Sequence, residues 1–225
     1  MSILVTRDVK KNYCRAGREF QAVAGVDFHL EKGEFVHIIG RSGSGKSTFL
    51  SLLSGMLRPT SGQVLFKGED LAAKSDREIS TYRNVSIGVI PQFVSTMPNL
   101  SVLENIILPK MFQSKRKEDV QMATERARIL MEKLEISHLE RQFPRELSGG
   151  EVRRVMIARA MINAPEVLLA DEPTSDLDKK SGVEVMQQFK KLNDEGVSLV
   201  VVTHELDVLS FGSRTLEMEE GLFIR

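Results

Sequence analysis

The stretch GRSGSGKST, residues 40–48, has the composition and spacing of a loop that binds phosphate. It matches Gly-x-x-x-x-Gly-Lys-Ser and lies between a predicted buried strand and a predicted helix, the context that this pattern requires. Glycines let backbone N–H groups surround a phosphate, Lys46 can reach the β- and γ-phosphates, and the Ser47 hydroxyl is a suitable Mg²⁺ ligand. A plain glycine-rich turn is the alternative, which the flanking strand and helix argue against. The predicted nucleoside triphosphate site comprises Gly40, Arg41, Ser42, Gly43, Ser44, Gly45, Lys46, Ser47 and Thr48.

Two adjacent acids follow a second apolar stretch, in VLLADEP. Asp171 is predicted to end a strand, and α/β sheets place ligands at the carboxyl ends of their strands. A carboxylate there suits a magnesium shell, through water, so Asp171 joins Ser47 as a predicted metal residue. Glu172 can then polarise the attacking water. The competing interpretation of Glu172 is a solvated loop acid.

Three further residues are candidates because of where they lie in the pattern. His204 ends the apolar stretch VSLVVVT and could contact the γ-phosphate or orient water, although a lone histidine is more often structural. Gln92 ends SIGVIP, where an amide could sense magnesium or water. Tyr13 precedes a polar loop and could stack on adenine; an ordinary exposed tyrosine is the alternative.

A second glycine-containing stretch, LSGGE, raises the possibility of another anion site. Ser148 and Glu151 have the spacing of a capping box, and apolar residues then recur at helical spacing. A cap needs the serine but not Gly149 and Gly150, which each cost a helix roughly 1 kcal/mol relative to alanine. Glycines at a helix N-terminus allow close approach of an anion to bare N–H groups.

The elements that must position these residues are those of an α/β protein. Continuous apolar runs at 34–40, 166–171 and 197–204 predict parallel strands buried on both faces. The alternating pattern near the N-terminus predicts antiparallel strands, and a helix is expected from Lys46 to about Met56. Further predicted elements are a strand at 63–68, a strand at 86–92, a helix-rich stretch at 101–145 opened by a Ser101–Glu104 capping box, a crossover helix at 180–196 and a small hairpin at 214–224.

Bulk composition narrows the class of protein further. The 225 residues carry a formal net charge of +0, so no basic excess points to nucleic-acid binding. A single cysteine excludes an intrachain disulfide and suits a reducing compartment. The longest apolar runs are far shorter than the roughly 20 residues of a membrane span. We therefore expect a soluble protein that could associate with a membrane through a partner.

The motifs occur in one order along the chain, and this order resembles the ATP-binding subunits of ABC transporters. The order is the phosphate loop, Gln92, LSGGE, VLLADEP, SDLD (175–178) and His204. The resemblance covers nearly the whole chain and implies an ABC ATPase fold, with ATP and Mg²⁺ as cofactors. It also implies that Ser148, Gly149, Gly150 and Glu151 hold the γ-phosphate of ATP bound to a second copy of the chain. Asp178 would lie in the loop that signals across that dimer interface.

The stretches SVLENIILP and RTLEMEEGLF resemble the subgroup of lipoprotein-release, macrolide-efflux and cell-division ATPases. This resemblance implies a peripheral place on the cytoplasmic face of the membrane and permease subunits that carry an extracytoplasmic domain. ATP-driven dimerisation would power them. The expected organisation is one domain, 1–225, with a P-loop core and antiparallel β part at about 1–91 and 146–225. A helical subdomain at about 92–145, with the helix start at 147–151, would carry the partner surface.

Three features depart from the family pattern. Pro91 precedes Gln92 where an aromatic is usual, Asp176 stands where the subgroup often has Asn, and Val152–Arg153 replace a polar pair containing Gln. None of these removes a core catalytic group. The alternatives to a transporter motor are a soluble ABC ATPase of cofactor assembly or DNA metabolism, and an ordinary phosphate-loop kinase. The kinase would leave LSGGE unexplained, and DNA metabolism would require a coiled coil or basic insert that the sequence lacks.

Overall fold

The computed structural model describes residues 2–15, 17–112 and 116–224; residues 113–115, inside the predicted helical insertion, lie outside the described residues. Its centre is a six-stranded sheet in the order β10-β9-β3-β8-β7-β6. The five strands from β9 to β6 run parallel, and β10 pairs antiparallel with β9. The strands are β3 (Phe35–Ile39), β6 (Ile87–Ile90), β7 (Val167–Asp171), β8 (Ser198–Val202), β9 (Arg214–Glu219) and β10 (Leu222–Phe223). The buried parallel strands and the C-terminal hairpin are confirmed.

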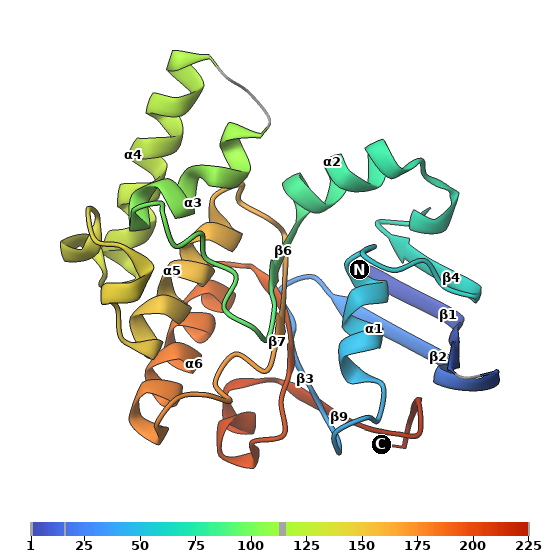
Figure 1. The fold of residues 1–225 in the computed structure, drawn as a ribbon. Helices are drawn as coiled ribbons and strands as arrows, with labels where there is room; N and C mark the ends of the chain where they lie inside the picture. Colours follow the sequence, from blue (N-terminus) through green and yellow to red (C-terminus); the bar gives the residue numbers. More distant parts are fainter. Residues whose placement is uncertain (1, 16, 113–115, 225) are drawn as a thin grey trace.

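A separate antiparallel sheet flanks this core, as predicted, in the order β2-β1-β4-β5. Its strands are β1 (Ser2–Arg15), β2 (Arg18–Glu31), β4 (Ser61–Phe66) and β5 (Glu69–Asp70). Helix α1 (Lys46–Leu53) lies between the two sheets (Figure 1). Phe49 on α1 packs edge-on against Phe28 of β2 and Phe223 of β10, so one apolar core joins the helix to both sheets. The phosphate loop therefore precedes a helix that packs against both sheets.

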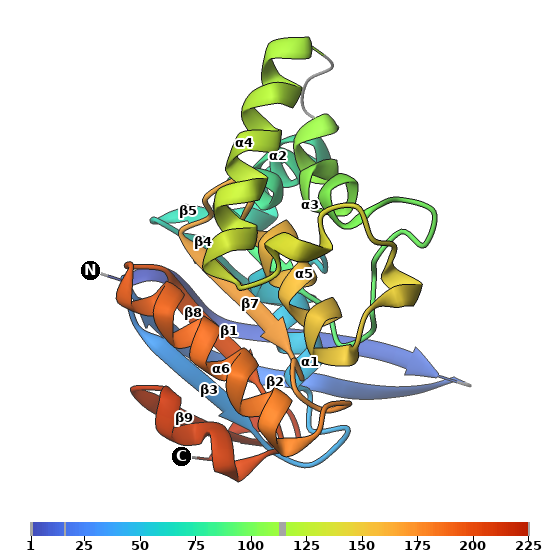
Figure 2. The same ribbon diagram turned by 90° about the vertical axis from the view of Figure 1, so that its left-hand side faces the viewer.

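Four helices lie on the opposite side of the parallel sheet: the last two in chain order pack against its strands, and the first two pack on the third (Figures 1 and 2). They are α3 (Val102–Met111), α4 (Lys117–Lys133), α5 (Gly149–Met161) and α6 (Lys179–Asp194). Alternate residues of the strands enter two different cores: Leu168 and Val201 pack with these helices, whereas Leu169 and Val200 pack with α1 and the antiparallel sheet. Burial on both faces explains why these strands are mostly apolar. The predicted capping box of α3, Ser101 with Glu104, is present.

Two helix predictions need correction. Helix α1 ends at Leu53, not near Met56, because Gly55 adopts a left-handed conformation with φ of 68°. Helix α2 (Asp76–Ser86) was not predicted, although Ser75 and Glu78 form a complete capping box at its start.

Short 3-10 helices also span Leu71–Ala73 (η1), Ser137–Leu139 (η2), Pro144–Glu146 (η3) and Leu206–Phe211 (η4).

The architecture confirms an α/β core with a mostly parallel sheet, an antiparallel flank and a helical part. The division of one domain into a core at about 1–91 and 146–225 and a helical subdomain at about 92–145, with the helix start at 147–151, stays a prediction. Across the described residues, no helix has both the length and the apolar content needed to span a bilayer.

Candidate nucleotide site

The phosphate loop follows β3 and can be formed only with glycine at two positions. Gly40 has φ of 149°, and a Cβ there would lie 2.2 Å from the Met218 carbonyl oxygen. Gly45 has φ of 107°, and its Cβ would lie 2.1 Å from the Ala22 carbonyl oxygen. Both conformations are unfavourable for residues with a side chain, and both contacts are with backbone that cannot move aside cheaply. The fold of this chain itself therefore requires these glycines.

Lys46 lies inside the loop and is almost fully buried, at 5% exposure. Its ammonium donates hydrogen bonds to the carbonyl oxygens of Gly40 (2.7 Å) and Arg41 (2.8 Å). Burial lowers the pKa of Lys46, and the charges of Glu172 and Asp171 act in the opposite direction. A cation held among loop carbonyls beside two acids is placed to meet the negative charge of a phosphate group.

Asp171 ends β7 next to Ser47 at the start of α1. Burial raises the pKa of Asp171, while a hydrogen bond from Ser47 acts in the opposite direction. Its Oδ1 atom is buried and has no hydrogen-bond partner among the described residues. A carboxylate oxygen of this kind is a fitting contact for a hydrated Mg²⁺ ion. The described residues contain no group of three or more His, Cys, Asp or Glu side chains able to hold a metal, so phosphate oxygens and water would have to complete the shell.

Glu172 and His204 lie together at the ends of adjacent strands. The Nδ1 atom of His204 is 3.0 Å from the Glu172 carboxylate, and the Glu172 side chain is 17% exposed. Glu172 has φ of 45°, unusual for a residue other than glycine, and its N–H donates to the Val202 carbonyl oxygen at 2.8 Å. Strained backbone of this kind is concentrated at functional sites. The geometry favours a positioned acid over a solvated loop acid.

A cleft of about 440 Å³ brings together nine of the predicted residues. The lining comprises Tyr13, Phe20, Gln21, Ala22, Ser42, Gly43, Gly45, Lys46, Ser47, Thr48, Gln92 and Glu172. Tyr13 and Phe20 stack at one end, with ring centroids 5.6 Å apart and planes at 25°. Phe20 was missed by the sequence reasoning. It lies opposite Tyr13 in the β1–β2 register, so pairing the two strands residue by residue would have found it.

The other predicted residues lie elsewhere. Ser148, Gly149, Gly150 and Glu151 start α5 and do not line the cleft. Ser148 accepts a hydrogen bond from the Glu151 N–H, and the Glu151 carboxylate accepts one from the Ser148 N–H at 2.7 Å, so the capping box is confirmed. Asp178 caps α6 through the N–H groups of Lys180 and Ser181. The structure does not bring these residues to their own chain's phosphate loop.

The glycines of α5 differ from those of the phosphate loop. Neither Gly149 nor Gly150 has a positive φ. A Cβ on Gly150 would lie 3.5 Å from the Ser181 Cβ, an ordinary contact. A Cβ on Gly149 would lie 3.0 Å from the end of the Leu177 side chain, which would have to shift by a few tenths of an ångström, and no backbone atom blocks it. Nothing that the structure describes within this chain requires glycine at either position.

Comparisons with known proteins identify the family to which the chain belongs. A family model described as ABC transporter matches residues 23–175. Lipoprotein-releasing system ATP-binding protein LolD of Aquifex aeolicus is 41% identical, covering 94% of this chain and 93% of that protein. The uncharacterized ABC transporter ATP-binding protein YknY of Bacillus subtilis is 39% identical, covering 95% and 92%. The dimeric structure of MJ0796, a bacterial ABC transporter cassette, superposes with a TM-score of 0.90 at 36% identity, covering 99% and 97%.

A second structure of that cassette, dimeric and in a post-hydrolysis state bound to ADP and Pi, gives a TM-score of 0.89 at 36% identity, covering 99% and 97%. The predicted ABC ATPase fold and the resemblance to lipoprotein-release ATPases are confirmed. A soluble ATPase of cofactor assembly or DNA metabolism is not favoured, because the relatives are transporter ATP-binding proteins. The chain belongs to the ABC transporter family, as an ATP-binding subunit whose domain hydrolyses ATP.

Proposed function

We propose that two copies of this chain enclose ATP between them, and that their closing and opening drives a separate membrane subunit. The observation that carries this proposal is the contrast between the two glycine pairs. Gly40 and Gly45 are required by the fold of the chain, whereas Gly149 and Gly150 are not. Glycines that the chain does not need for itself allow close approach of something outside it. A second copy of the chain, presenting its bound nucleotide, supplies that group.

Within one cleft, each residue has a distinct task in the proposal. Lys46 moves its hydrogen bonds from loop carbonyls to the β- and γ-phosphates. Ser47, Asp171 and Gln92 would hold Mg²⁺, and the ion would neutralise charge on the phosphates. Glu172 accepts a proton from the attacking water, and His204, 3.0 Å away, orients that carboxylate and reaches toward the γ-phosphate. The Tyr13–Phe20 stack receives the adenine ring.

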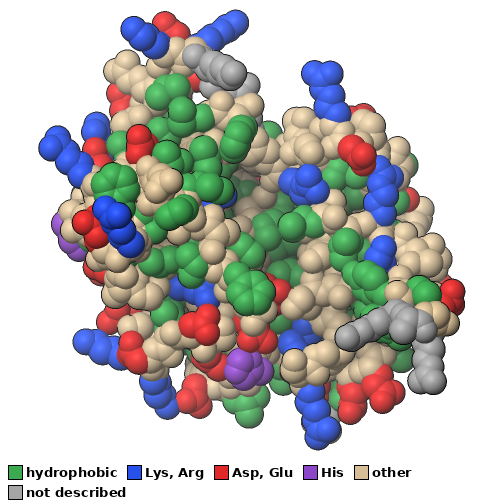
Figure 3. Space-filling model, viewed as in Figure 1, with side chains coloured by type: hydrophobic (Ala, Val, Ile, Leu, Met, Phe, Trp, Pro, Cys, Tyr) green, Lys and Arg blue, Asp and Glu red, His purple; other side chains and the backbone are tan. Residues whose placement is uncertain are grey.

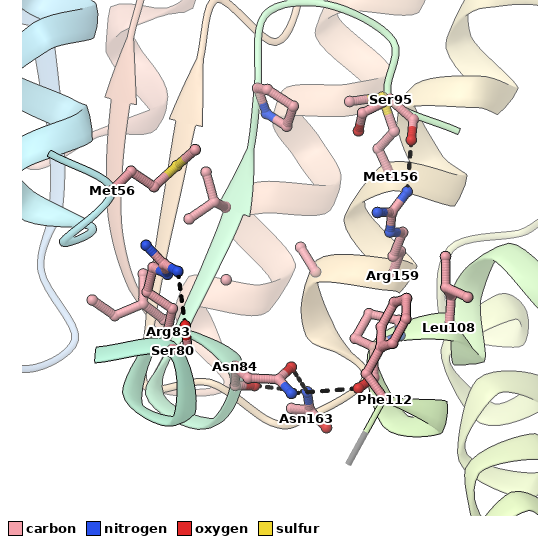
Figure 4. Close-up of a pocket in the computed structure, with 16 residues that line it drawn as sticks. Met56, Ser80, Arg83, Asn84, Ser95, Leu108, Phe112, Met156, Arg159 and Asn163 are labelled. Atoms are coloured by element: carbon pink, nitrogen blue, oxygen red, sulfur yellow. Dashed lines mark hydrogen bonds between the residues drawn. The ribbon is translucent and has the colours of Figure 1, made fainter. Parts of the chain in front are cut away.

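The membrane subunit is proposed to dock in a second cleft of about 610 Å³, between α2 and β6 on one side and α3 and α5 on the other. Figure 3 shows this hollow between the two upper lobes, lined with hydrophobic side chains. Arg83 and Arg159 lie on opposite walls, and no acidic residue is among the lining (Figure 4). Phe112 and Met56 lie at the cleft with exposures of 81% and 58%. A partner segment with apolar side chains and a carboxylate matches this surface.

This assignment extends the expectation for the helical insertion, whose apolar loop holds Met97 and Leu100. The relatives named as lipoprotein-release proteins support a place on the cytoplasmic face of a membrane, beside permease subunits with an extracytoplasmic domain. Export, lipoprotein release and macrolide efflux all fit this architecture. Co-purification from membranes tests the docking surface: Arg159→Glu and Phe112→Asp should each reduce recovery of the membrane subunit while ATP binding by the isolated chain persists. Unchanged recovery in both variants would place the docking surface elsewhere.

A mixed dimer tests the shared nucleotide site. Lys46→Ala damages the phosphate loop, and Ser148→Arg blocks the start of α5, so each variant alone has both sites damaged. If a site combines Lys46 of one copy with Ser148 of the other, a mixed dimer holds both lesions in one site and leaves the other intact. Mixing the variants should therefore restore Mg²⁺-dependent trapping of ATP in part of the population. Background trapping in verified mixed dimers would show that Ser148 only caps its own helix.

Glu172→Gln separates binding from chemistry. The amide keeps the shape of the side chain but cannot accept a proton from water. Turnover should fall by about 10²-fold or more, and an ATP-dependent dimer should accumulate on size-exclusion chromatography. Turnover at the wild-type rate would remove Glu172 from the mechanism.

A further inference from the structure

Arg153 is a buried cation on α5 that the proposed chemistry does not use. It is 2% exposed, although it belongs to a residue type that is rarely buried without partners. Its guanidinium donates to the carbonyl oxygen of Gln92 at 2.9 Å and to that of Pro91 at 3.4 Å. It also lies 3.4 Å from a carboxylate oxygen of Asp176, whose side chain is 79% exposed. One side chain thus joins α5, the segment after β6 and the loop after β7.

Two of the three partners of Arg153, Pro91 and Asp176, depart from the family pattern, as does Arg153 itself. Pro91, Asp176 and Arg153 lie 62 and 23 residues apart along the chain and meet at one guanidinium. A buried guanidinium is costly unless its N–H groups are hydrogen-bonded. Since Asp176 is mostly in water, the backbone carbonyls of Pro91 and Gln92 are the contacts that desolvation strengthens. The position of these carbonyls is therefore fixed relative to α5.

Fixing the backbone of Gln92 fixes where its side chain enters the nucleotide cleft. Gln92 is the only lining residue of that cleft, among those the structure describes, that comes from the segment after β6. We propose that Arg153 is a positioning residue for Gln92: it couples any displacement of α5 to the place of the Gln92 amide at the magnesium and the attacking water. This rests on the proposed function, in which the start of α5 contacts the nucleotide of the partner copy. Arg153 would then connect the two nucleotide sites through one chain.

Steady-state ATP hydrolysis by the full chain tests this coupling through a double-mutant cycle. Arg153→Met removes all three contacts and keeps a side chain of similar length. We expect its kcat to fall about tenfold, since hydrogen bonds from charged groups are worth about that factor, while the Kd for ATP changes less than about twofold. The Mg²⁺ concentration for half-maximal rate should rise. Gln92→Ala should lower kcat as well, and the Arg153→Met/Gln92→Ala double variant should be no slower than Gln92→Ala alone.

Arg154 supplies a matched control on the same helix. It makes an ion pair of 2.7 Å with Glu184 on α6, and among the described residues it has no hydrogen bond or ion pair with the Gln92 segment. Arg154→Met should therefore change kcat by the same factor in Gln92→Ala as in the wild type, whether that factor is large or small. Arg153→Lys keeps the charge but not the planar fork of donors, so it should restore kcat only in part. If Arg153→Met is unstable, Arg153→Gln, which retains N–H donors, is taken through the same cycle.

Two results would overturn the proposal. One is an additive double variant, in which Arg153→Met slows Gln92→Ala by as much as it slows the wild type. The other is a loss of ATP affinity and thermal stability with kcat unchanged, which would make Arg153 purely structural. Both are read in preparations where every copy carries the same substitutions, so they are distinct from the mixed-dimer result. A failed mixed dimer would remove the proposed trans site and leave the Arg153–Gln92 coupling to be judged by this cycle.

Discussion

The starts of α1 and α5 show two ways of building a helix N-terminus. Helix α1 follows Gly45, has no side-chain cap and has no acidic residue in its first turn. Helix α5 follows Ser148, has a complete capping box and carries Glu151 in its first turn. The first leaves its N–H groups directed at the phosphate loop, and the second satisfies part of them from its own side chains. The start of α1 is therefore suited to binding an anion, at the expense of helix stability. The start of α5 is built mainly to stabilise its own helix.

The charges around the two helix starts also differ: positive charge is added at the start of α1, and negative charge at the start of α5. Buried Lys46 lies at the start of α1 and adds positive charge to the helix dipole. Hydrogen bonds from the Ser148 hydroxyl and N–H lower the pKa of Glu151, so α5 carries a negative charge at its positive end. An anion bound at α1 needs no other protein. One that approaches α5 must already be held by another site, which in the proposed dimer is the Lys46 loop of the partner copy.

Among substitutions at the two helix starts, Gly45→Ala should have the largest effect, a loss of ATP affinity. The new Cβ would lie 2.1 Å from the Ala22 carbonyl oxygen in a backbone conformation with φ of 107°. The loop must then shift, and a displacement of about 1 Å in a positioning group costs about 10²-fold. We expect ATP affinity of the monomer to fall by about that factor, as measured by isothermal titration calorimetry. Near-normal affinity would show that the loop tolerates a conformation without glycine.

At the start of α5, Gly150→Ala should leave the monomer intact and weaken the dimer. Its Cβ would have an ordinary contact of 3.5 Å with Ser181, and alanine favours a helix by up to about 1 kcal/mol. Monomer stability and ATP binding should be unchanged or slightly higher. The ATP-dependent dimer should nevertheless be weakened about tenfold, because the added methyl group occupies the surface that the partner's phosphate approaches. Analytical ultracentrifugation in the Glu172→Gln background measures this. An unweakened dimer would mean that the glycine is unnecessary there.

The sequence predicted the parts of the fold in which local pattern and burial agree. The strands β3, β7 and β8 are apolar at four of five positions each because both faces are covered. The phosphate loop has a spacing that few other structures share. Helix α2 was missed because it is polar and only Ile79 is buried, so its apolar periodicity is weak. Its capping box was the available signal.

The remaining gaps concern contacts between distant parts of the chain. Helical periodicity gives no reason to bury Arg153, whose partners follow β6 and β7. Chain order does not show that Ser148 lies away from the cleft that holds Lys46, because the crossing of α5 over the sheet sets that separation. Local pattern predicts which residues are chemically capable, and tertiary packing decides which of them meet.

Glu151→Gln gives the smallest predicted effect and isolates charge from shape. Glutamine can keep the capping box with Ser148, so the start of α5 should retain its geometry. It removes the negative charge that the partner's γ-phosphate would approach. We therefore expect the ATP-dependent dimer to tighten by about threefold at low salt, with the gain shrinking at high salt as screening removes the repulsion.

The pH dependence of stability separates the two roles of Glu151. The pKa of Glu151 is lowered in the folded chain, chiefly by hydrogen bonds from Ser148. The carboxylate therefore stabilises the fold above the ordinary glutamate pKa of 4.5, and this contribution is lost as pH falls through the lowered value. Glu151→Gln lacks this titration, so thermal melts of variant and wild type should converge in acid. A variant with a weaker dimer at every salt concentration would show that the carboxylate itself contacts the partner, and the contrast between the two helix starts would then rest on shape alone.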